Sequence, residues 1–105
     1  MAQFDVYRNA NAAQARRIPF VVDVQSDLLD HLATRVVVPL ADPKVIEGKP
    51  AKTLNPAFVI EGRRVIMLTP QLAGIPRKAL GKKVSELHDK RAEIVAALDL
   101  TLTGV

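Results

Sequence analysis

The chain has 105 residues, of which 49% are hydrophobic and 25% are charged. This composition is typical of one small folded domain and excludes an intrinsically disordered chain. So short a domain buries a limited share of its surface. A dimer is therefore plausible from the sequence, because a second subunit would cover further apolar surface. The formal net charge of +4 comes from basic residues scattered along the chain, a spread that does not favour a nucleic-acid-binding surface.

Several classes of protein are excluded by what the sequence lacks. The chain has no cysteine, which rules out disulfides, zinc fingers and thiolate nucleophiles. Its first residues lack the basic segment and apolar stretch of a secretory signal. No apolar run approaches the ~20 residues that a membrane span requires. We therefore expect a cytoplasmic protein with no membrane partner.

The N-terminal part of the chain predicts three strands. Apolar residues alternate with polar ones over residues 3–8 and 18–25, and the intervening segment is small and polar, as in a loop. Three consecutive valines predict a third strand over residues 34–39. Pro39 is expected to lie at a strand end or on a sheet edge because proline cannot donate to a ladder.

The middle of the chain predicts a long loop followed by a hairpin. Proline, glycine and charges over residues 41–55 indicate a loop, with a short strand near Val45. Two apolar runs, residues 56–60 and 64–69, flank a short glycine-containing connection and predict a hairpin at the centre of the sheet. A Thr-Pro pair beginning at Thr69 predicts a single helical turn.

The last third of the chain predicts one amphipathic helix. From Val84 to Leu102, apolar residues recur at spacings of three and four. Ser85 is the expected N-terminal cap, and Glu86 lies one turn before Lys90 in the favourable order.

No residue pattern in the chain predicts catalysis. His31 and His88 are the only histidines, and neither has a second histidine at metal-ligand spacing, so no metal site is expected. The hydroxyl and carboxylate residues near His31 have no nucleophile elbow, and residues 26–31 are interpreted as a hydrogen-bonded turn. Glu93 and Asp99 would lie on different faces of the helix and cannot act as a carboxylate pair. We therefore expect no catalytic residues and no cofactor, and a binding module rather than an enzyme.

Residues 20–30, which read Phe-Val-Val-Asp-Val-Gln-Ser-Asp-Leu-Leu-Asp, are followed nine residues on by Pro39 and Leu40. With this pattern the chain resembles the CcdB family of toxins. Further matching segments are Gln3-Phe4, Val6-Tyr7, Val65-Ile66-Met67, Gly74-Ile75-Pro76 and the terminal Gly104-Val105. The resemblance covers nearly the whole chain, residues 1–105, as a single toxin domain, and is weakest in the two predicted loops.

The resemblance implies a mainly β fold with one C-terminal α-helix. The small antiparallel sheet would form a partly closed barrel of the Src-homology-3-like type, assembled as a two-fold homodimer. Members of this family are not enzymes: they bind the A subunit of bacterial DNA gyrase and trap the complex that holds cleaved DNA. A disordered segment of a CcdA-type antitoxin neutralises them, and a disordered segment that folds on binding can wrap a large surface. The toxin–antitoxin complex represses its own operon, so operator DNA would be bound only through that complex.

The resemblance also implies which residues face gyrase. The family's apolar pair after the Gln-Ser-Asp turn and its C-terminal residues fall on Leu28, Leu29, Asp99, Leu102, Thr103, Gly104 and Val105. Thr103 stands where the family has a tryptophan that stacks on a gyrase arginine, and the cation–π part of that contact is worth roughly 0.5 to 2 kcal/mol. Asp99 replaces an asparagine and adds a negative charge.

Other interpretations remain open at this stage. The paired leucines are equally consistent with ordinary core positions, and the last residues with a frayed terminus. The substitution at Thr103 is compatible with a non-toxic homologue that still binds an antitoxin. A ribonuclease, like related barrel toxins, is a further alternative, and it would need a positioned base and cationic groups around the scissile phosphate.

Overall fold

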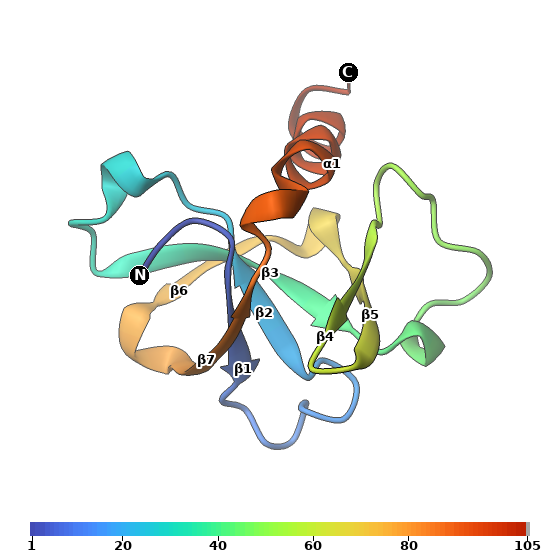
Figure 1. The fold of residues 1–105 in the computed structure, drawn as a ribbon, viewed down its shortest axis with the longest axis horizontal. Helices are drawn as coiled ribbons and strands as arrows, with labels where there is room; N and C mark the ends of the chain where they lie inside the picture. Colours follow the sequence, from blue (N-terminus) through green and yellow to red (C-terminus); the bar gives the residue numbers. More distant parts are fainter. Residues whose placement is uncertain (105) are drawn as a thin grey trace.

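The computed structural model describes residues 1–104 of the chain. In this range seven strands form one sheet and are followed by the helix α1 (Arg91–Thr103) (Figure 1). The strands are β1 (Asp5–Asn9), β2 (Phe20–Asp23), β3 (Thr34–Ala41), β4 (Ala57–Ile60), β5 (Arg63–Met67), β6 (Ala73–Pro76) and β7 (Leu80–Glu86). Short 3-10 helices cover Asp27–Leu29, Pro43–Val45, Thr69–Gln71, Arg77–Ala79 and His88–Lys90.

All strand pairs in the sheet are antiparallel. The order is β4-β5-β3-β2-β1-β7, and β6 also pairs with β3. The sheet curls into a half-barrel, and α1 lies at one of its ends (Figure 1). The mainly β fold with a C-terminal helix is therefore confirmed.

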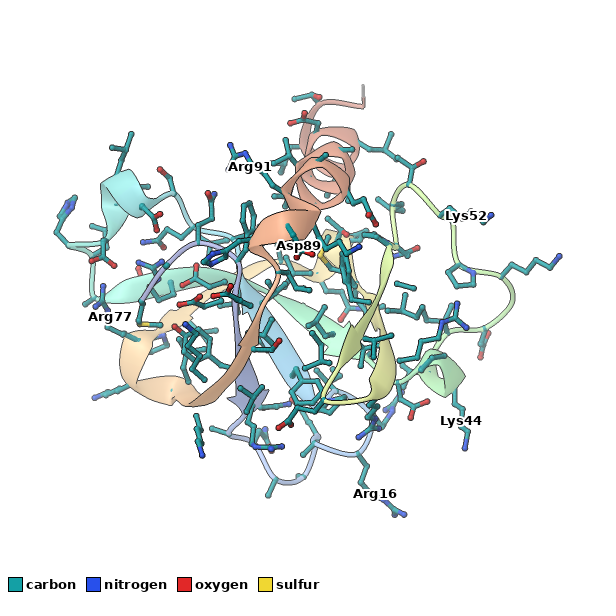
Figure 2. The ribbon with its side chains drawn as sticks, in the orientation of Figure 1. Arg16, Lys44, Lys52, Arg77, Asp89 and Arg91 are labelled. Carbon is teal, nitrogen blue, oxygen red and sulfur yellow. The ribbon has the colours of Figure 1, made fainter. Side chains whose placement is uncertain are left out.

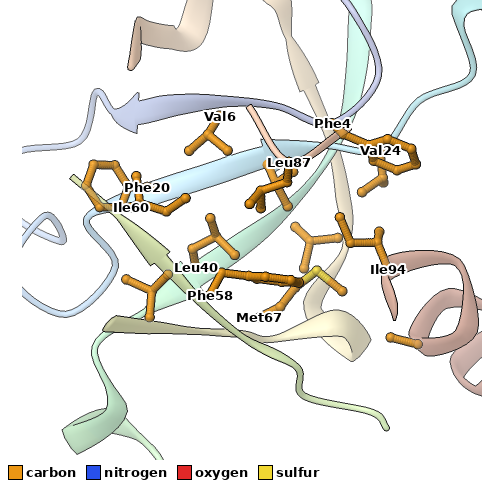
Figure 3. Close-up of a cluster of buried hydrophobic side chains, with 14 residues drawn as sticks. Phe4, Val6, Phe20, Val24, Leu40, Phe58, Ile60, Met67, Leu87 and Ile94 are labelled. Atoms are coloured by element: carbon orange, nitrogen blue, oxygen red, sulfur yellow. The ribbon is translucent and has the colours of Figure 1, made fainter. Parts of the chain in front are cut away.

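The core lies between the concave face of the curled sheet and the first turns of α1. Ile94 and Ala97 are the helix residues that are buried in it (Figure 3). Full burial of a side chain such as Ile94 contributes about 1.5–3 kcal/mol. The strand residues of this core are Val6, Phe20, Val22, Val38, Leu40, Phe58, Ile60, Val65 and Met67.

The predicted hairpin exists, but its predicted place in the sheet is wrong. Ile60 pairs with Arg63, so Glu61 and Gly62 form a two-residue turn with φ of 52° and 76°. Two positive φ values belong to a type I′ turn, whose twist suits adjacent strands. The hairpin forms an edge of the sheet rather than its centre, because β4 pairs only with β5.

Pro39 is not confined to a strand end or edge, contrary to the prediction. It lies inside β3, opposite Val21 of β2. On the other side of β3, residues 34–37 pair with β6 and residues 40 and 41 pair with β5. Pro39 falls between these two ladders, where no neighbouring strand requires its missing N–H. Its carbonyl accepts a hydrogen bond from the N–H of Leu68 at 2.9 Å.

The predicted strand near Val45 is also wrong. The segment Pro43–Val45 is a 3-10 helix, with Asp42 as its cap and a proline at its start. The single turn predicted at Thr69 is present, although Leu68 occupies the cap position. The Thr69 hydroxyl instead donates to the Leu54 carbonyl at 2.6 Å and fixes the end of the long loop.

The strands β6 and β7 were not predicted, and the predicted helix begins too early. Ser85 does not cap a helix: it lies in β7, paired with Val6 of β1. The β1–β7 ladder contains two register shifts, and a bulge removes the period-two pattern that identifies a strand. The α-helix starts only at Arg91, after the 3-10 turn His88–Lys90. No helix in residues 1–104 is long and apolar enough to cross a membrane.

Candidate functional site

The paired leucines lie on the loop of residues 26–33, which joins β2 to β3. The Ser26 side chain accepts a hydrogen bond from the Leu28 N–H at 3.2 Å and starts the 3-10 helix. Leu28 is 89% exposed and Leu29 is 45% exposed. The interpretation of these leucines as core residues is therefore wrong: both side chains project from the fold.

The first half of this loop is fixed by polar contacts to its backbone and to the Asp27 side chain. Gln25 is buried, and its Nε2 donates to the Leu29 carbonyl at 2.9 Å while its Oε1 accepts from the Val36 N–H at 3.0 Å. The Gln3 N–H donates to Asp27 Oδ1 at 2.8 Å. The exposed leucines thus stand on a loop that is tied to the segment before β1 and, through Gln25, to Val36 of β3.

The second half of the loop is tied to a buried ion pair. Arg35 of β3 is fully buried, and its guanidinium lies 2.7 Å from Asp23 Oδ2 and 3.0 Å from Asp30 Oδ1. Burial raises the pKa of Asp23, and the hydrogen bonds from Arg35 and from the Gln25 N–H offset only part of that rise. Asp30 in turn lies on the loop, so the pair links the core to the segment that carries the leucines.

The C-terminal end of α1 is the second predicted region of the site. Gly104 ends the helix with φ of 78°, and its N–H donates to the carbonyls of Asp99 at 3.2 Å and Leu100 at 3.1 Å. Such a left-handed end favours glycine because a side chain there is strained. Leu102 is 68% exposed, and the Thr103 hydroxyl donates to the Asp99 carbonyl at 2.7 Å.

Asp99, Thr103 and Gly104 are exposed as well, and Val105 lies outside the described residues. In Figure 1 the leucine loop and the end of α1 project as two separate protrusions beyond the same rim of the half-barrel. The predicted site residues thus form two exposed regions rather than one continuous patch.

A polar cluster around the buried Asp5 was missed from the sequence. Asp5 Oδ1 lies 3.3 Å from Lys83 Nζ and 3.2 Å from His88 Nε2, and Tyr7 donates its hydroxyl hydrogen bond to Oδ2 at 3.5 Å. His88 therefore has a carboxylate partner that the sequence reasoning did not find, since the two residues are 83 positions apart. The only available signal was that Asp5 and Tyr7 share one face of β1, which proves to be buried.

The electrostatics of this cluster are those of an ion-pair network. Burial by itself would raise the pKa of Asp5, but the Ala2 N–H, Lys83 and His88 together hold that pKa below its usual value. Burial and the nearby Asp5 charge raise the pKa of Tyr7 to about 12.

The cluster includes three residues of metal-ligating type, Asp5, Glu86 and His88, with ligand atoms within 4.8 Å of one another. The Lys83 ammonium already faces Asp5 Oδ1, where a cation would bind. Both ring nitrogens of His88 face carboxylates, since Nδ1 lies 3.8 Å from Glu86. These contacts suit a structural joint between β1, β7 and the segment before α1.

Residues 3–104 match the protein family described as CcdB protein. The chain belongs to the CcdB family. CcdB proteins are toxins of toxin–antitoxin systems, and membership supports that role for this chain.

Two solved structures share the CcdB fold seen here. One is an endoribonuclease from mycobacterial species in complex with its cognate antitoxin, with a TM-score of 0.73 at 15% identity, covering 97% of this chain and 94% of that chain. The other is an endoribonuclease from mycobacterial species, with a TM-score of 0.70 at 16% identity, covering 97% and 90% of the two chains. At such low identity the likeness establishes the half-barrel fold and leaves the activity to be argued from this chain's residues.

The structure gathers several basic residues that are scattered in this CcdB sequence. Arg16, Arg17, Lys44 and Arg63 line one hollow of about 660 Å³ together with Asp42 and Glu47. Figure 2 shows Arg16 and Lys44 on the side of the sheet away from the tip of α1. Arg63 is paired with Asp42 at 3.0 Å.

Proposed function

We propose that this CcdB-family toxin binds the A subunit of bacterial DNA gyrase and traps the complex that holds cleaved DNA. The observation that carries the proposal is the exposed pair Leu28 and Leu29 on a loop whose backbone is fixed by hydrogen bonds. An exposed apolar pair on a fixed backbone suits a binding anchor, because little conformational freedom is lost when a partner covers it.

The second anchor region in this proposal is the end of α1. Leu102 offers an exposed apolar side chain, and the left-handed Gly104 leaves room for a close backbone approach. In a two-fold homodimer each of these regions would occur twice, which suits a target that is itself two-fold symmetric. Asp99, Thr103 and Val105 complete the proposed surface by their place in the family pattern.

The proposal includes a CcdA-type antitoxin as the neutralising partner. A disordered antitoxin segment would order itself on the toxin surface, and the complex of the two would bind operator DNA and repress the operon. The family assignment supports the antitoxin partner. The toxin acts in this scheme by binding, without catalytic residues.

The deciding experiment is a DNA cleavage assay with purified protein, bacterial gyrase, ATP and supercoiled plasmid. We expect protein-linked linear DNA after treatment with detergent and protease, and its loss when a CcdA-type antitoxin segment is added. A folded dimeric protein that gives no linear DNA would contradict gyrase poisoning and would favour a non-toxic homologue that retains antitoxin binding.

The endoribonuclease fold neighbours give a second candidate, which the same sample can test. Incubation with RNA would reveal cleavage if the basic hollow around Arg16, Arg17 and Lys44 served a nuclease. We expect intact RNA. RNA cleavage, together with toxicity in cells whose gyrase resists the toxin, would replace the gyrase proposal.

A further inference from the structure

Arg77 contacts the leucine loop from a distant part of the sequence. Its Nη2 donates to the carbonyl of Asp30 and, at 3.2 Å, to the carbonyl of Leu32. The same nitrogen lies 3.5 Å from Asp30 Oδ1. The Arg77 backbone N–H donates to the Ala33 carbonyl at 2.9 Å. One residue therefore holds three successive points along the second half of the loop.

The sheet register explains why Arg77 reaches this loop. Strand β6 pairs with β3, and Pro76 lies opposite Thr34, the first residue of β3. Arg77 follows Pro76 directly and so emerges beside the point where the loop enters the sheet. Figure 2 shows the side chain below the loop. Because the position follows from strand pairing, the contact is built into the fold.

Asp30 lies between a buried arginine, Arg35, and a partly exposed one, Arg77. Arg35 is fully buried and fixes the Asp30 carboxylate from inside the protein at 3.0 Å. Arg77 is partly exposed and binds Asp30 from the outside. Arg35 contacts only the side chain of Asp30, whereas Arg77 binds loop carbonyls, which fix the path of the backbone. Charge-assisted hydrogen bonds of this kind are stronger than neutral ones.

We infer that Arg77 is a positioning residue that holds residues 30–33 so that Leu28 and Leu29 stand in the conformation that binds the target. The inference rests on the proposed gyrase function and adds to it a residue outside the predicted surface. Arg77 itself need not touch gyrase. Without it, the Asp30 and Leu32 carbonyls lose their side-chain donor, and the leucine pair loses the support of the loop's second half.

The test compares Arg77→Gln with Lys78→Gln in the full-length protein. Lys78 is the next residue of the same 3-10 helix, is exposed, and has no ion pair within residues 1–104, so its variant is a matched loss of one charge. Amide hydrogen exchange is measured at Leu29, Asp30 and Leu32, whose N–H groups close the loop's internal turns. Binding to purified gyrase A subunit is measured on the same samples.

For Arg77→Gln we expect exchange at these amides to speed up at least about tenfold and gyrase affinity to fall by about tenfold, while the unfolding midpoint stays near that of Lys78→Gln. Arg77→Lys keeps the charge, but its side chain is shorter and reaches the two carbonyls less well, so its exchange rates and affinity should fall between those of Arg77→Gln and Lys78→Gln. Arg77→Gln matching Lys78→Gln in exchange would overturn the inference. So would faster exchange with unchanged gyrase affinity.

The two proposals fail in different ways. If the wild-type protein does not bind gyrase, the proposed function is wrong and Arg77 has no role in presenting the leucines to gyrase. The exchange comparison still decides whether Arg77 fixes the loop, because it uses no partner. If the wild type binds and Arg77→Gln binds equally well, only the role of Arg77 is wrong.

Discussion

The two regions of the proposed gyrase surface are built in different ways. The leucine loop is held by the Gln3 N–H and by the side chains of Gln25, Arg35 and Arg77, and it presents two large apolar side chains. The end of α1 is held by its own helix, through the Gly104 N–H and the hydroxyl of Thr103. Thr103 stands there in place of the tryptophan of the family pattern. If the chain binds gyrase as proposed, we therefore expect the loop to carry most of the binding energy.

The largest expected effect comes from disrupting the buried ion pair of Asp23 and Arg35, which supports the leucine loop. Asp23→Ala leaves the Arg35 guanidinium buried without its closest carboxylate, which should lower the free energy of unfolding by about 3–5 kcal/mol. Chemical denaturation measures this loss. A destabilisation below about 1 kcal/mol would mean that Asp30 alone can neutralise Arg35.

A double variant separates stability from loop position. Asp23→Leu combined with Arg35→Met removes both charges, and replacing a buried ion pair by apolar residues is often neutral or stabilising. We expect much of the stability to return while gyrase binding stays weakened, because Asp30 has lost its inner partner. Recovery of both would show that the loop does not depend on Arg35.

The next largest effect is expected when an exposed leucine of the loop is replaced by a charged residue. Leu28→Asp should weaken gyrase binding by about 2 kcal/mol, or roughly thirtyfold, as expected for an interface hot spot. The fold should be unaffected because Leu28 is 89% exposed. Titration calorimetry with the gyrase A subunit measures the affinity.

Val59 provides the matched control for Leu28. It is 67% exposed on the edge strand β4, away from both proposed regions, so Val59→Asp makes the same kind of change elsewhere. Equal losses for the two variants would point to a general effect of surface charge and would contradict a binding role for the loop.

Features set by neighbouring residues could be predicted from the sequence, whereas contacts between distant residues could not. The leucine pair was predicted from the family resemblance, because it follows the short local motif Gln-Ser-Asp of that family, and Ser26 caps the next turn as local rules predict. Arg77 carries no such signal, since its contact with Asp30 spans 47 positions and depends on the β3–β6 register. The fold class was predictable, but β7 was hidden by bulges in its pairing with β1.

The smallest expected effect concerns the helix end. Thr103→Trp restores the aromatic ring of the family pattern and should strengthen gyrase binding by about 0.5–2 kcal/mol through contact with a cation on the target. Thr103→Leu is the control, because it adds apolar area without a π face. The hydrogen bond from the Thr103 hydroxyl to the Asp99 carbonyl is lost in both variants, so it does not affect their comparison. A gain for tryptophan alone would show that the helix end still faces its target and has been weakened by substitution. No gain for either variant, beside a loss for Leu28→Asp, would show that gyrase is contacted through the loop and that the helix end lies outside the interface.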